Sequence, residues 1–448
     1  QVMHIAIVGN GISGITAARF VRKWSNHRIS VISSESDYFF SRTALMYVYM
    51  GHLHLQDTQP YPSEFWGKNR IELIRAQVTG LNHSGKKILL NKGRSISYDK
   101  LVIATGSVSH FFNWPGQNLE GVRGFYSLQD LDYIEKYSTG LESAVITGGG
   151  LIGVELAEMF HSRNIPVTML VREKSYWDNV LPAEESAMVS RYIRGNGIDL
   201  RTETSLKAIL DNGRGKVGAV LTDGGETITC GFVGVTTGVR PNIDWLGSKG
   251  PETDSGILVD DFLQTSIPDV YAIGDCAQLR QPQSDRKPIE AIWYSGRMMG
   301  ETLAWNLCKE PLPYRPGIWF NSAKFFHIEY QVYGQVPALL PPDQDTLYWE
   351  HPDGQKSLRI NFSKDNLAVT GFQAMGLRLR QEVCHKWLEN KTSVDEVLPD
   401  LALANFDPEF YRRYEKAIVS QYNLDFQKNI SLKPSRKLLN KVYQFLKS

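Results

Sequence analysis

The stretch HIAIVGNGISG, residues 4–14, decides the fold that this sequence specifies. Its first five residues predict a short, largely apolar strand, and three glycines follow with the spacing GxGxxG. A helical pattern of apolar residues comes next, and a second strand over residues 28–32 ends close to Glu35. An acid at this point can accept hydrogen bonds from ribose hydroxyls. Strand, glycine turn, helix, strand and acid are the parts, in the right order, of a Rossmann dinucleotide site.

Each glycine of this turn has its own task. Gly9 permits the tight turn, Gly11 lets the backbone approach a pyrophosphate, and Gly14 lets the helix pack closely against the strand. The helix that begins near Ile12 and Ser13 would present free N–H groups and a partial positive charge to the phosphates.

The same arrangement occurs a second time. A strand over residues 143–147 is followed by the turn GGGLIG, by a helical pattern and by another strand over residues 166–171. Two complete units in one chain predict two dinucleotides, and the simplest interpretation is a tightly held FAD and an exchanging NAD(P)H. The second turn would bind its nucleotide through Gly148, Gly150, Leu151, Ile152 and Gly153.

The composition excludes several other classes of protein. The chain has 448 residues, 42% hydrophobic and 22% charged, which is ordinary for a globular protein of several domains. A net charge of +1 gives no indication of a nucleic-acid partner. No run of about twenty apolar residues occurs, so no helix is expected to span a membrane. The four cysteines lie far apart without a CxxC pair, which favours a reducing compartment, the cytoplasm, and gives no metal site.

Further motifs resemble those of the FAD-dependent pyridine nucleotide-disulfide oxidoreductase superfamily. The best match is its branch of ferredoxin and rubredoxin reductases and the flavin portion of NAD(P)H nitrite reductases. Residues 101–107 (LVIATGS) resemble the strand that ends in ATG, residues 237–242 (TGVRPN) the GxRPN turn, and residues 270–277 (VYAIGDCA) the second FAD motif. Residues 292–297 (IWYSGR) stand where the family places a helix N-terminus under the flavin ring. The resemblance covers about residues 3–310 in the same order.

The resemblance implies an α/β fold with two nested Rossmann-like dinucleotide-binding domains plus a C-terminal α+β domain. The expected boundaries are residues 1–112 and 251–312 for a discontinuous FAD-binding domain, residues 113–250 for the NAD(P)-binding domain, and residues 313–448 for a C-terminal interface or acceptor domain. In this last part, residues 345–375 predict antiparallel strands, and helices follow over about residues 377–389.

The resemblance also implies cofactor contacts. Asp275 would contact the ribityl chain of FAD, and Arg42 would lie against the flavin or its phosphates. The alternatives are a helix N-cap for Asp275 and a surface guanidinium for Arg42. At the ribose the family's acid aligns with Ser34, and we expect the neighbouring Glu35 to bind. The expected FAD contacts are Gly9, Gly11, Ile12, Ser13, Gly14, Ser34, Glu35, Arg42, Val78, Ala104, Thr105, Gly106, Gly274, Asp275, Ile292 and Trp293.

The residues after the strand 167–171 favour different nicotinamide nucleotides. Arg172 suits the 2′-phosphate of NADPH and inclines the prediction to that nucleotide, whereas Glu173 suits the ribose of NADH. Glu155 matches a family glutamate that touches the nicotinamide amide; alternatively, it is an acid placed in a first helical turn by the helix dipole. Gly238, in the GxRPN turn, completes this set.

The position of the cysteines indicates the chemistry. Disulfide-reducing members of the family carry a cysteine in the first domain, whereas no cysteine precedes Cys230 here. A thiol relay needs a sulfur beside the flavin, so we expect hydride transfer from NAD(P)H to FAD and then electron transfer to an external acceptor. Candidates for the acceptor's face of the flavin, or for plain core, are Trp293, Trp319 and Phe320.

A redox protein is the first choice of acceptor. One alternative is a peripheral-membrane NAD(P)H:quinone oxidoreductase, and another is a slow-turnover flavoprotein that serves as an interaction scaffold. The membrane alternative depends on the amphipathic segment 433–448, whose apolar face could lie on an anionic membrane or dock onto its own domain. That segment includes Arg436 and Lys437.

Overall fold

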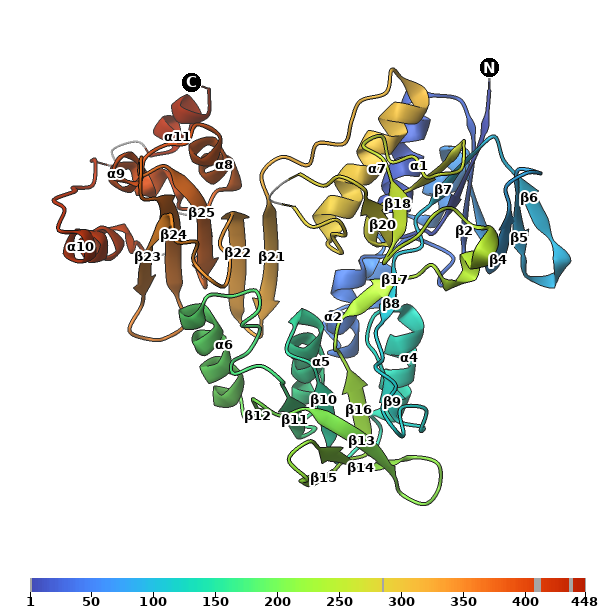
Figure 1. The fold of residues 1–448 in the computed structure, drawn as a ribbon, viewed down its shortest axis with the longest axis horizontal. Coiled ribbons are helices and arrows are strands. Elements are labelled where there is room, and N and C mark those ends of the chain that lie inside the picture. The colour runs from blue at the N-terminus through green and yellow to red at the C-terminus, as the bar shows by residue number, and fades with distance from the viewer. Residues whose placement is uncertain (1, 284–285, 407–411, 435–437, 448) are drawn as a thin grey trace. The chain divides into compact units, whose positions relative to one another are not determined.

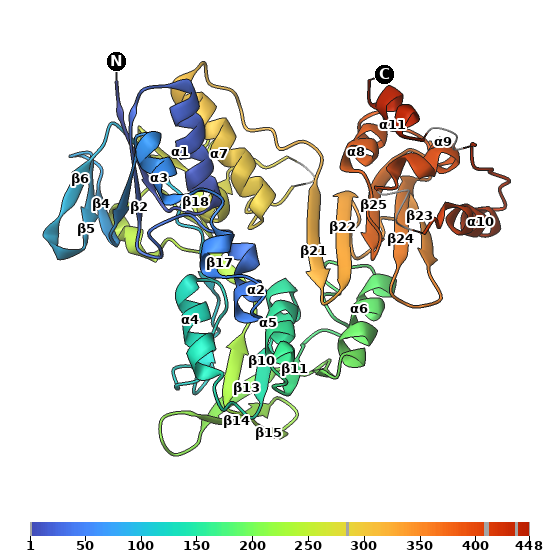
Figure 2. The same cartoon turned by 180° about the vertical axis from the view of Figure 1, so that it is seen from behind.

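The computed structural model describes residues 2–283, 286–406, 412–434 and 438–447, the side chains of residues 438–440 excepted (Figures 1 and 2). Arg436 and Lys437 therefore lie outside the described residues. The chain divides into two compact units, each with its own apolar core. Unit 1 comprises Gln1–Gly148, Met159–Val167 and Leu206–Pro316, and unit 2 comprises Gly149–Glu158, Thr168–Ser205 and Gly317–Ser448.

A five-stranded parallel sheet forms the centre of unit 1. Its strand order is β19-β7-β1-β2-β3, with β19 at Val270–Ala272, β7 at Lys100–Ile103, β1 at His4–Val8, β2 at Arg28–Ser33 and β3 at Ile71–Arg75. Ile5, Ala6 and Ile7 in the middle strand are fully buried. Strands covered on both faces read as continuous apolar runs, which is why residues 4–8 do not alternate with polar residues.

Helices α1 (Ile12–Trp24) and α7 (Trp293–Cys308) lie side by side against this sheet (Figures 1 and 2). Glycines permit their close approach. A Cβ atom at Gly300 would lie 2.6 Å from the carbonyl oxygen of Ser13, and one at Gly296 would lie 3.4 Å from the Cγ2 atom of Ile12. The first turns of the two helices are therefore neighbours, and both helices begin at the same end of the sheet.

The remaining elements of unit 1 are small sheets and short helices. Parallel pairing joins β10 (Ala144–Thr147) to β16 (Phe232–Val235) and β16 to β9 (Val122–Arg123). The other strands are β4 (Val78–Asn82), β5 (Lys87–Leu90), β6 (Ser95–Ser97), β8 (Ser107–Ser109), β13 (Leu206–Asp211), β14 (Val217–Thr222), β15 (Thr227–Thr229), β17 (Val239–Pro241), β18 (Ile257–Val259) and β20 (Ala277–Leu279). The other helices are α2 (Leu45–Tyr49), α3 (Ser63–Lys68) and α4 (Leu128–Tyr137).

A five-stranded antiparallel sheet forms the core of unit 2. Its order is β21-β22-β25-β24-β23, with β21 at Phe320–Phe325, β22 at Ile328–Gly334, β23 at Gln344–Glu350, β24 at Ser357–Ser363 and β25 at Val369–Met375. The helices that follow are α8 (Gln381–Glu389), α9 (Val394–Val397), α10 (Glu415–Phe426) and α11 (Leu438–Lys447). Two further strands, β11 (Val167–Leu170) and β12 (Asp199–Arg201), pair in parallel, and helix α6 spans Ala183–Gly195.

A buried ion cluster attaches α6 to the antiparallel sheet. The guanidinium of Arg359 on β24 is 5% exposed and donates to carboxylate oxygens of Glu185 at 2.7 Å and of Glu184 at 2.6 Å. Glu185 is fully buried, and the paired arginine compensates the cost of burying its charge. Removing Arg359 would leave the charge of Glu185 unpaired in the interior of unit 2.

These elements confirm the predicted α/β fold class. The strand, glycine turn, helix and strand of the second nucleotide unit are β10, the turn 148–150, α5 (Leu151–Ser162) and β11. The antiparallel strands expected within residues 345–375 are present as β23, β24 and β25. Strands β21 and β22, which complete that sheet, were not predicted from the sequence, although Ile328, Tyr330 and Val332 alternate with less buried residues. The three-domain boundaries stay a prediction.

Replacement of Gly300 by alanine tests the contact between α1 and α7. We expect Gly300→Ala to lower the free energy of unfolding by about 1–3 kcal/mol, because a Cβ atom cannot occupy a site 2.6 Å from the Ser13 carbonyl. Gly67→Ala is the matched control, because no atom lies within 4 Å of a Cβ there. It should be neutral or stabilising by up to about 1 kcal/mol. Equal urea midpoints for the two variants would contradict the close packing.

Candidate functional site

The first glycine turn joins β1 to α1 through two close backbone contacts. Gly9 has a φ of +112°, and a Cβ atom there would lie 2.0 Å from the carbonyl oxygen of Ala104. A Cβ at Gly14 would lie 2.1 Å from the carbonyl oxygen of Gly9. In contrast, no atom lies within 4 Å of a Cβ at Gly11. The turn therefore has two glycines that packing requires and one that faces open space.

The N-terminus of α1 is left without a side-chain cap. Gly11 is the N-cap residue and the first turn contains no acid, so its free N–H groups and partial positive charge are available to an anion. The buried amide of Asn10 donates to the carbonyl and the hydroxyl oxygen of Ser36, both at 3.1 Å, and so attaches the turn to the chain beyond β2. An open glycine beside uncapped N–H groups fits the pyrophosphate of a dinucleotide.

The N-terminus of α7 lies at the same place. Its N-cap residue is Ile292, and the helix, which begins at Trp293, also has neither a side-chain cap nor an acid in its first turn. Gly274 has a φ of +74°, and its Cβ would lie 2.5 Å from the hydroxyl oxygen of Ser13. A Cβ at Gly296 would lie 3.9 Å from the Cα of Gly274. Segments that are more than 250 residues apart in the sequence thus meet at one end of the parallel sheet.

The ATG and GxRPN motifs are bonded to each other. The hydroxyl of Thr105 donates to the carbonyl oxygen of Asn242 at 2.8 Å, and the backbone N–H of Asn242 donates to the carbonyl oxygen of Gly106 at 2.9 Å. Strands β8 and β17 then pair in antiparallel fashion directly beyond these motifs. The carbonyl oxygen of Gly238 accepts a hydrogen bond from the backbone of His110 at 3.0 Å. These bonds hold the two motifs together where the chain leaves the first Rossmann unit and where it returns to it.

The carboxyl group of Asp275 lies buried beside these two motifs. The hydroxyl of Ser107 donates to its Oδ2 atom at 3.0 Å, and the hydroxyl of Tyr126 lies 3.3 Å from the same atom. Burial raises the pKa of Asp275, against these two hydrogen bonds. The hydroxyl oxygen of Tyr126 would lie 2.9 Å from a Cβ at Gly106, so the tyrosine packs directly on the ATG turn. Tyr126 was not predicted from the sequence, because it lies in no recognisable motif.

Glu35 and Arg42 form a bidentate ion pair. Both terminal nitrogens of the arginine donate to the two carboxylate oxygens at 2.7 Å. Burial opposes the charge of Glu35, but the hydrogen bonds of Arg42 hold the pKa of Glu35 below its ordinary value. The guanidinium also donates to the carbonyl oxygen of Tyr126 at 2.8 Å and lies 4.5 Å from the centre of that ring. This pair links the chain beyond β2 to the loop that precedes α4.

The other partners of Glu35 belong to the N-terminus of α4. Its Oε1 atom accepts from the backbone N–H of Leu128 at 3.0 Å, and its carbonyl oxygen accepts from the side chain of Gln129 at 2.9 Å. Ser34 is exposed, and Val78 begins β4 with Leu90 as its strand partner. The ribose contacts expected of Ser34 and Glu35, and the flavin contacts expected of Arg42 and Val78, stay predictions.

The second glycine turn repeats the pattern of the first. Gly148 has a φ of +123°, and a Cβ there would lie 2.2 Å from the carbonyl oxygen of Thr236. No atom lies within 4 Å of a Cβ at Gly150, directly before α5, and the first turn of α5 contains no acid. The alternative that placed Glu155 in that first turn is therefore wrong. The turn again offers open space at the glycine before a helix.

Glu155 on α5 is a carboxyl group in an unfavourable environment. Burial, and next the neighbouring charge of Glu158, raise the pKa of Glu155 to about 7. The Nζ atom of Lys324 on β21 lies 3.2 Å from a carboxylate oxygen of Glu158, so the charge of Lys324 mainly compensates that of Glu158. A carboxyl group with such a raised pKa can pair with a polar ligand.

The side chains of Glu173 and Arg172 point in different directions relative to the second glycine turn. The Oε2 atom of Glu173 would lie 3.6 Å from a Cβ at Gly149, whereas the side chain of Arg172 is 82% exposed. The guanidinium of Arg172 donates to the other carboxylate oxygen, Oε1, at 2.9 Å and 3.1 Å. The acid therefore faces the glycine turn, and the arginine points to solvent while neutralising it.

All four cysteines are free, and none has the character of a reactive thiolate. The thiol of Cys276 is fully buried, 3.4 Å from the carbonyl oxygen of Ile273, and burial raises its pKa to about 11. Burial likewise raises the pKa of Cys230 to about 12 and the pKa values of Cys308 and Cys384 above the ordinary range. Over the described ranges of the chain, no group of three or more His, Cys, Asp or Glu side chains could hold a metal ion.

The ion pair of Glu35 predicts a pH-dependent stability. Because the folded-state pKa of Glu35 is lowered, the pair stabilises the protein above the unfolded pKa of about 4.3, and the contribution is lost as the pH falls through the folded pKa. We expect Glu35→Gln to lose about 1–3 kcal/mol of unfolding free energy at neutral pH, and this deficit should shrink below about pH 4. Denaturant titrations across the pH range measure it.

Asp37→Asn provides the control for this measurement. Asp37 is largely exposed and lies 3.4 Å from Arg75, so its replacement should change the unfolding free energy by less than about 0.5 kcal/mol. A deficit for Glu35→Gln that stays constant from neutral to acid pH would contradict the role of the charge.

Curated relatives are similar over most of the chain. A p-cumate 2,3-dioxygenase system ferredoxin–NAD(+) reductase component from Pseudomonas putida is 27% identical, covering 88% of this chain and 95% of the relative. The assimilatory nitrate reductase electron transfer subunit of Bacillus subtilis is 27% identical over 61% of this chain. The chain spans only 36% of the length of that relative and 34% of a Bacillus subtilis NAD(P)H nitrite reductase.

Solved structures with the same fold cover nearly the whole chain. A ferredoxin reductase from Rhodopseudomonas palustris superposes with a TM-score of 0.76 at 23% identity, covering 83% of this chain and 91% of the other. An NAD-dependent persulfide reductase from A. fulgidus superposes with a TM-score of 0.83 at 24% identity, covering 95% of this chain and 83% of the other. The family model for pyridine nucleotide-disulphide oxidoreductases matches residues 3–299, which contain both glycine turns and the second FAD motif. The chain belongs to the pyridine nucleotide-disulphide oxidoreductase family, whose cofactors are FAD and NAD(P)H.

Proposed function

We propose that this protein transfers a hydride from NADH to FAD and passes the electrons on to a redox protein. The observation that carries the proposal is the meeting of two uncapped helix N-termini, those of α1 and α7, at the open glycine Gly11. Bound FAD supplies the chemistry, because it accepts two electrons together and can release them one at a time. The reaction is proposed to take place in the cytoplasm.

The residues of unit 1 bind and orient. The free N–H groups after Gly11 would hold the pyrophosphate, and the first turn of α7 adds a second partial positive charge beside it. Asp275 presents a buried carboxyl group next to the ATG turn, where it can bond to a hydroxyl of a polyhydroxylated chain. Hydride transfer needs no general acid or base, so positioning and exclusion of water are the contributions expected of the protein. The predicted FAD contacts and domain boundaries form part of this proposal.

A one-electron carrier protein is the acceptor that the chain supports best. Relatives are named as ferredoxin and rubredoxin reductases, and the cysteines of this chain are unsuited to a thiol relay, because burial raises their pKa values. Ring contacts give the aromatic candidate Phe320 a structural role, because its ring lies 5.6 Å from that of His385. The acceptor's face of the flavin stays a prediction.

The quinone alternative is less well supported. The apolar face of α11 contacts its own unit: Val442 is 7% exposed, the ring of Phe445 lies 5.8 Å from that of Trp387, and Lys386 donates to the carbonyl oxygen of Phe445. Among the described residues, no helix is both long and apolar enough to cross a membrane. Docking of the C-terminal segment onto its own domain is therefore the interpretation that we retain.

Flavin content and reduction test the proposal together. The purified protein should contain one FAD that NADH bleaches within seconds in a stopped-flow mixer, and a ferredoxin should reoxidise it faster than quinone or oxygen. Gly11→Ala should retain the fold of the apoprotein, because its Cβ meets no protein atom, and should lose at least tenfold in FAD affinity. Bleaching much slower than seconds would favour the scaffold function, and full flavin affinity in Gly11→Ala would contradict the site.

The orientation of Glu173 supports NADH as the donor. Its carboxylate faces the second glycine turn, where a ribose would lie, and a carboxylate pairs with ribose hydroxyls but repels a 2′-phosphate. This geometry opposes the inclination toward NADPH that Arg172 gives in the sequence, because the arginine side chain is exposed and already paired with the acid.

Replacement of Glu173 tests the choice of nucleotide. We expect a preference for NADH of at least tenfold in kcat/KM, and we expect Glu173→Gln to lower kcat/KM for NADH about tenfold, as loss of a charged hydrogen-bond acceptor does. Arg172→Ala is the matched control and should leave the NADH value within about twofold. A several-fold preference for NADPH in the unmodified protein would overturn the choice of NADH.

A further inference from the structure

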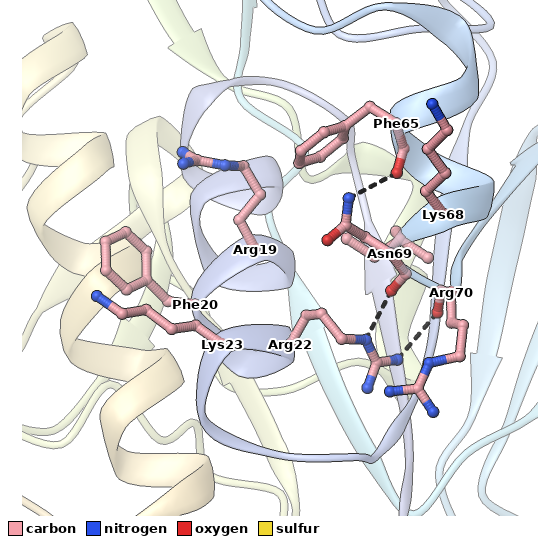
Figure 3. A pocket seen from close by; sticks show the side chains of 9 residues that line it. Arg19, Phe20, Arg22, Lys23, Phe65, Lys68, Asn69 and Arg70 are labelled. Carbon is pink, nitrogen blue, oxygen red and sulfur yellow. Dashed lines mark hydrogen bonds between the residues drawn. The ribbon is translucent and has the colours of Figure 1, made fainter.

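A cavity on the surface of unit 1 lies away from both glycine turns. It has a volume of about 500 Å³ and lies between the second half of α1 and the turn from α3 to β3 (Figure 3). That volume is in the range of small-molecule sites. The cavity's lining residues on α1 lie about 12–18 Å from Gly11, counted along the helix at 1.5 Å per residue. It is lined by Arg19, Phe20, Arg22, Lys23, Phe65, Lys68, Asn69, Arg70 and Ile71.

The lining is cationic and contains no acid. It includes three arginines and two lysines, and among the described residues none of these five side chains is paired with a carboxylate. The neighbouring strands differ: Arg28 is paired with Glu72 on β3, and Arg75 with Asp37. The whole chain carries a net charge of only +1, so this is a local concentration of positive charge. An anion in the cavity would relieve the mutual repulsion of these side chains.

The walls of the cavity are held by a specific clamp. The guanidinium of Arg22 donates to the carbonyl oxygens of Asn69 at 2.7 Å and Arg70 at 2.9 Å, and so ties the end of α1 to the α3–β3 turn (Figure 3). It also donates to the carbonyl oxygen of His27 at 2.7 Å. The amide of Asn69 in turn donates to the carbonyl oxygen of Phe65 at 2.8 Å. Carbonyl oxygens do not cancel the charge of Arg22, so the clamp fixes a full positive charge at the cavity wall.

Aromatic rings provide a second kind of contact. Phe20 and Phe65 line the cavity, and the ring of Phe65 stacks on that of Tyr61 with centroids 4.6 Å apart. The guanidinium of Arg19 lies 4.7 Å from the centre of the Tyr61 ring, and the ammonium of Lys23 lies 5.5 Å from the centre of the Phe20 ring. Rings beside cations are suited to a flat base that carries phosphates.

We propose that this cavity binds a nucleoside polyphosphate, with its phosphates on Arg19, Lys23 and Lys68 and its base against Phe20 or Phe65. Several negative charges match several unpaired cations, and the volume suits a small molecule better than one inorganic ion. The site is separate from the FAD and NAD(P)H turns, and its existence does not depend on the proposed redox activity.

Calorimetric titration of the flavin-loaded protein with ATP tests the site, with saturating NAD+ present to occupy the nicotinamide site. We expect one ATP per chain, competition by inorganic triphosphate, weaker binding of adenosine, and a loss of affinity as salt increases. The double variant Arg19→Ala/Lys68→Ala should bind ATP at least tenfold more weakly. Lys87→Ala, which removes an exposed lysine on β5, is the control and should bind as the unmodified protein does.

Three outcomes would overturn the proposal. They are absence of ATP binding, unchanged affinity in the double variant, and binding to phosphatidic acid vesicles without binding of soluble ATP. The last outcome would assign the cations to a lipid surface. The melting temperature of the double variant shows that it is folded, and its rate of flavin reduction by NADH should be unchanged. A protein that failed in flavin reduction but bound ATP in this manner would contradict the proposed function and leave the cavity site in place.

Discussion

The structure depends on a few places where one backbone touches another with no room for a side chain. Gly9 lies against Ala104, Gly14 against Gly9, and Gly300 against Ser13. These contacts bring the first turns of α1 and α7 together at the end of the parallel sheet. Two uncapped helix N-termini repel each other through their partial positive charges, and a bound anion between them would relieve that repulsion. The backbone contacts of unit 1 thus hold together the two helix ends that the proposed cofactor site uses.

The three carboxyl groups near the two glycine turns have different partners, and their pKa values differ accordingly. Glu35 is neutralised by a bidentate arginine, and its pKa is lowered. Asp275 is satisfied by hydroxyl groups while burial raises its pKa. Glu155 receives no hydrogen bond among the described residues, and its pKa rises to about 7. The first acid is suited to holding structure, and the other two have acceptor capacity left for a ligand.

Charge is distributed unevenly between the cofactor region and the outer surface of unit 1. Near the glycine turns, the charged side chains Glu35 and Arg42 pair with each other, and the backbone N–H groups at the start of α1 are left without a side-chain cap. On the far half of α1, cationic side chains crowd one cavity and have no acidic partners. In the two proposals, one helix would recognise two anions, by its dipole at one end and by its side chains at the other.

The sequence alone determined what depends on local spacing. The glycine turns, the strands and helices around them and three of the five antiparallel strands near the C-terminus could be predicted, because each has a short local pattern. The ATG and GxRPN motifs were identified through the family resemblance. Tertiary structure decided what depends on long-range contact. The pairing of Glu35 with Arg42, the position of Tyr126 on the ATG turn and the orientation of Glu173 toward Gly149 have no sequence signal. Side-chain partners are chosen by which surfaces the folded chain brings together, and spacing along the chain does not encode that choice.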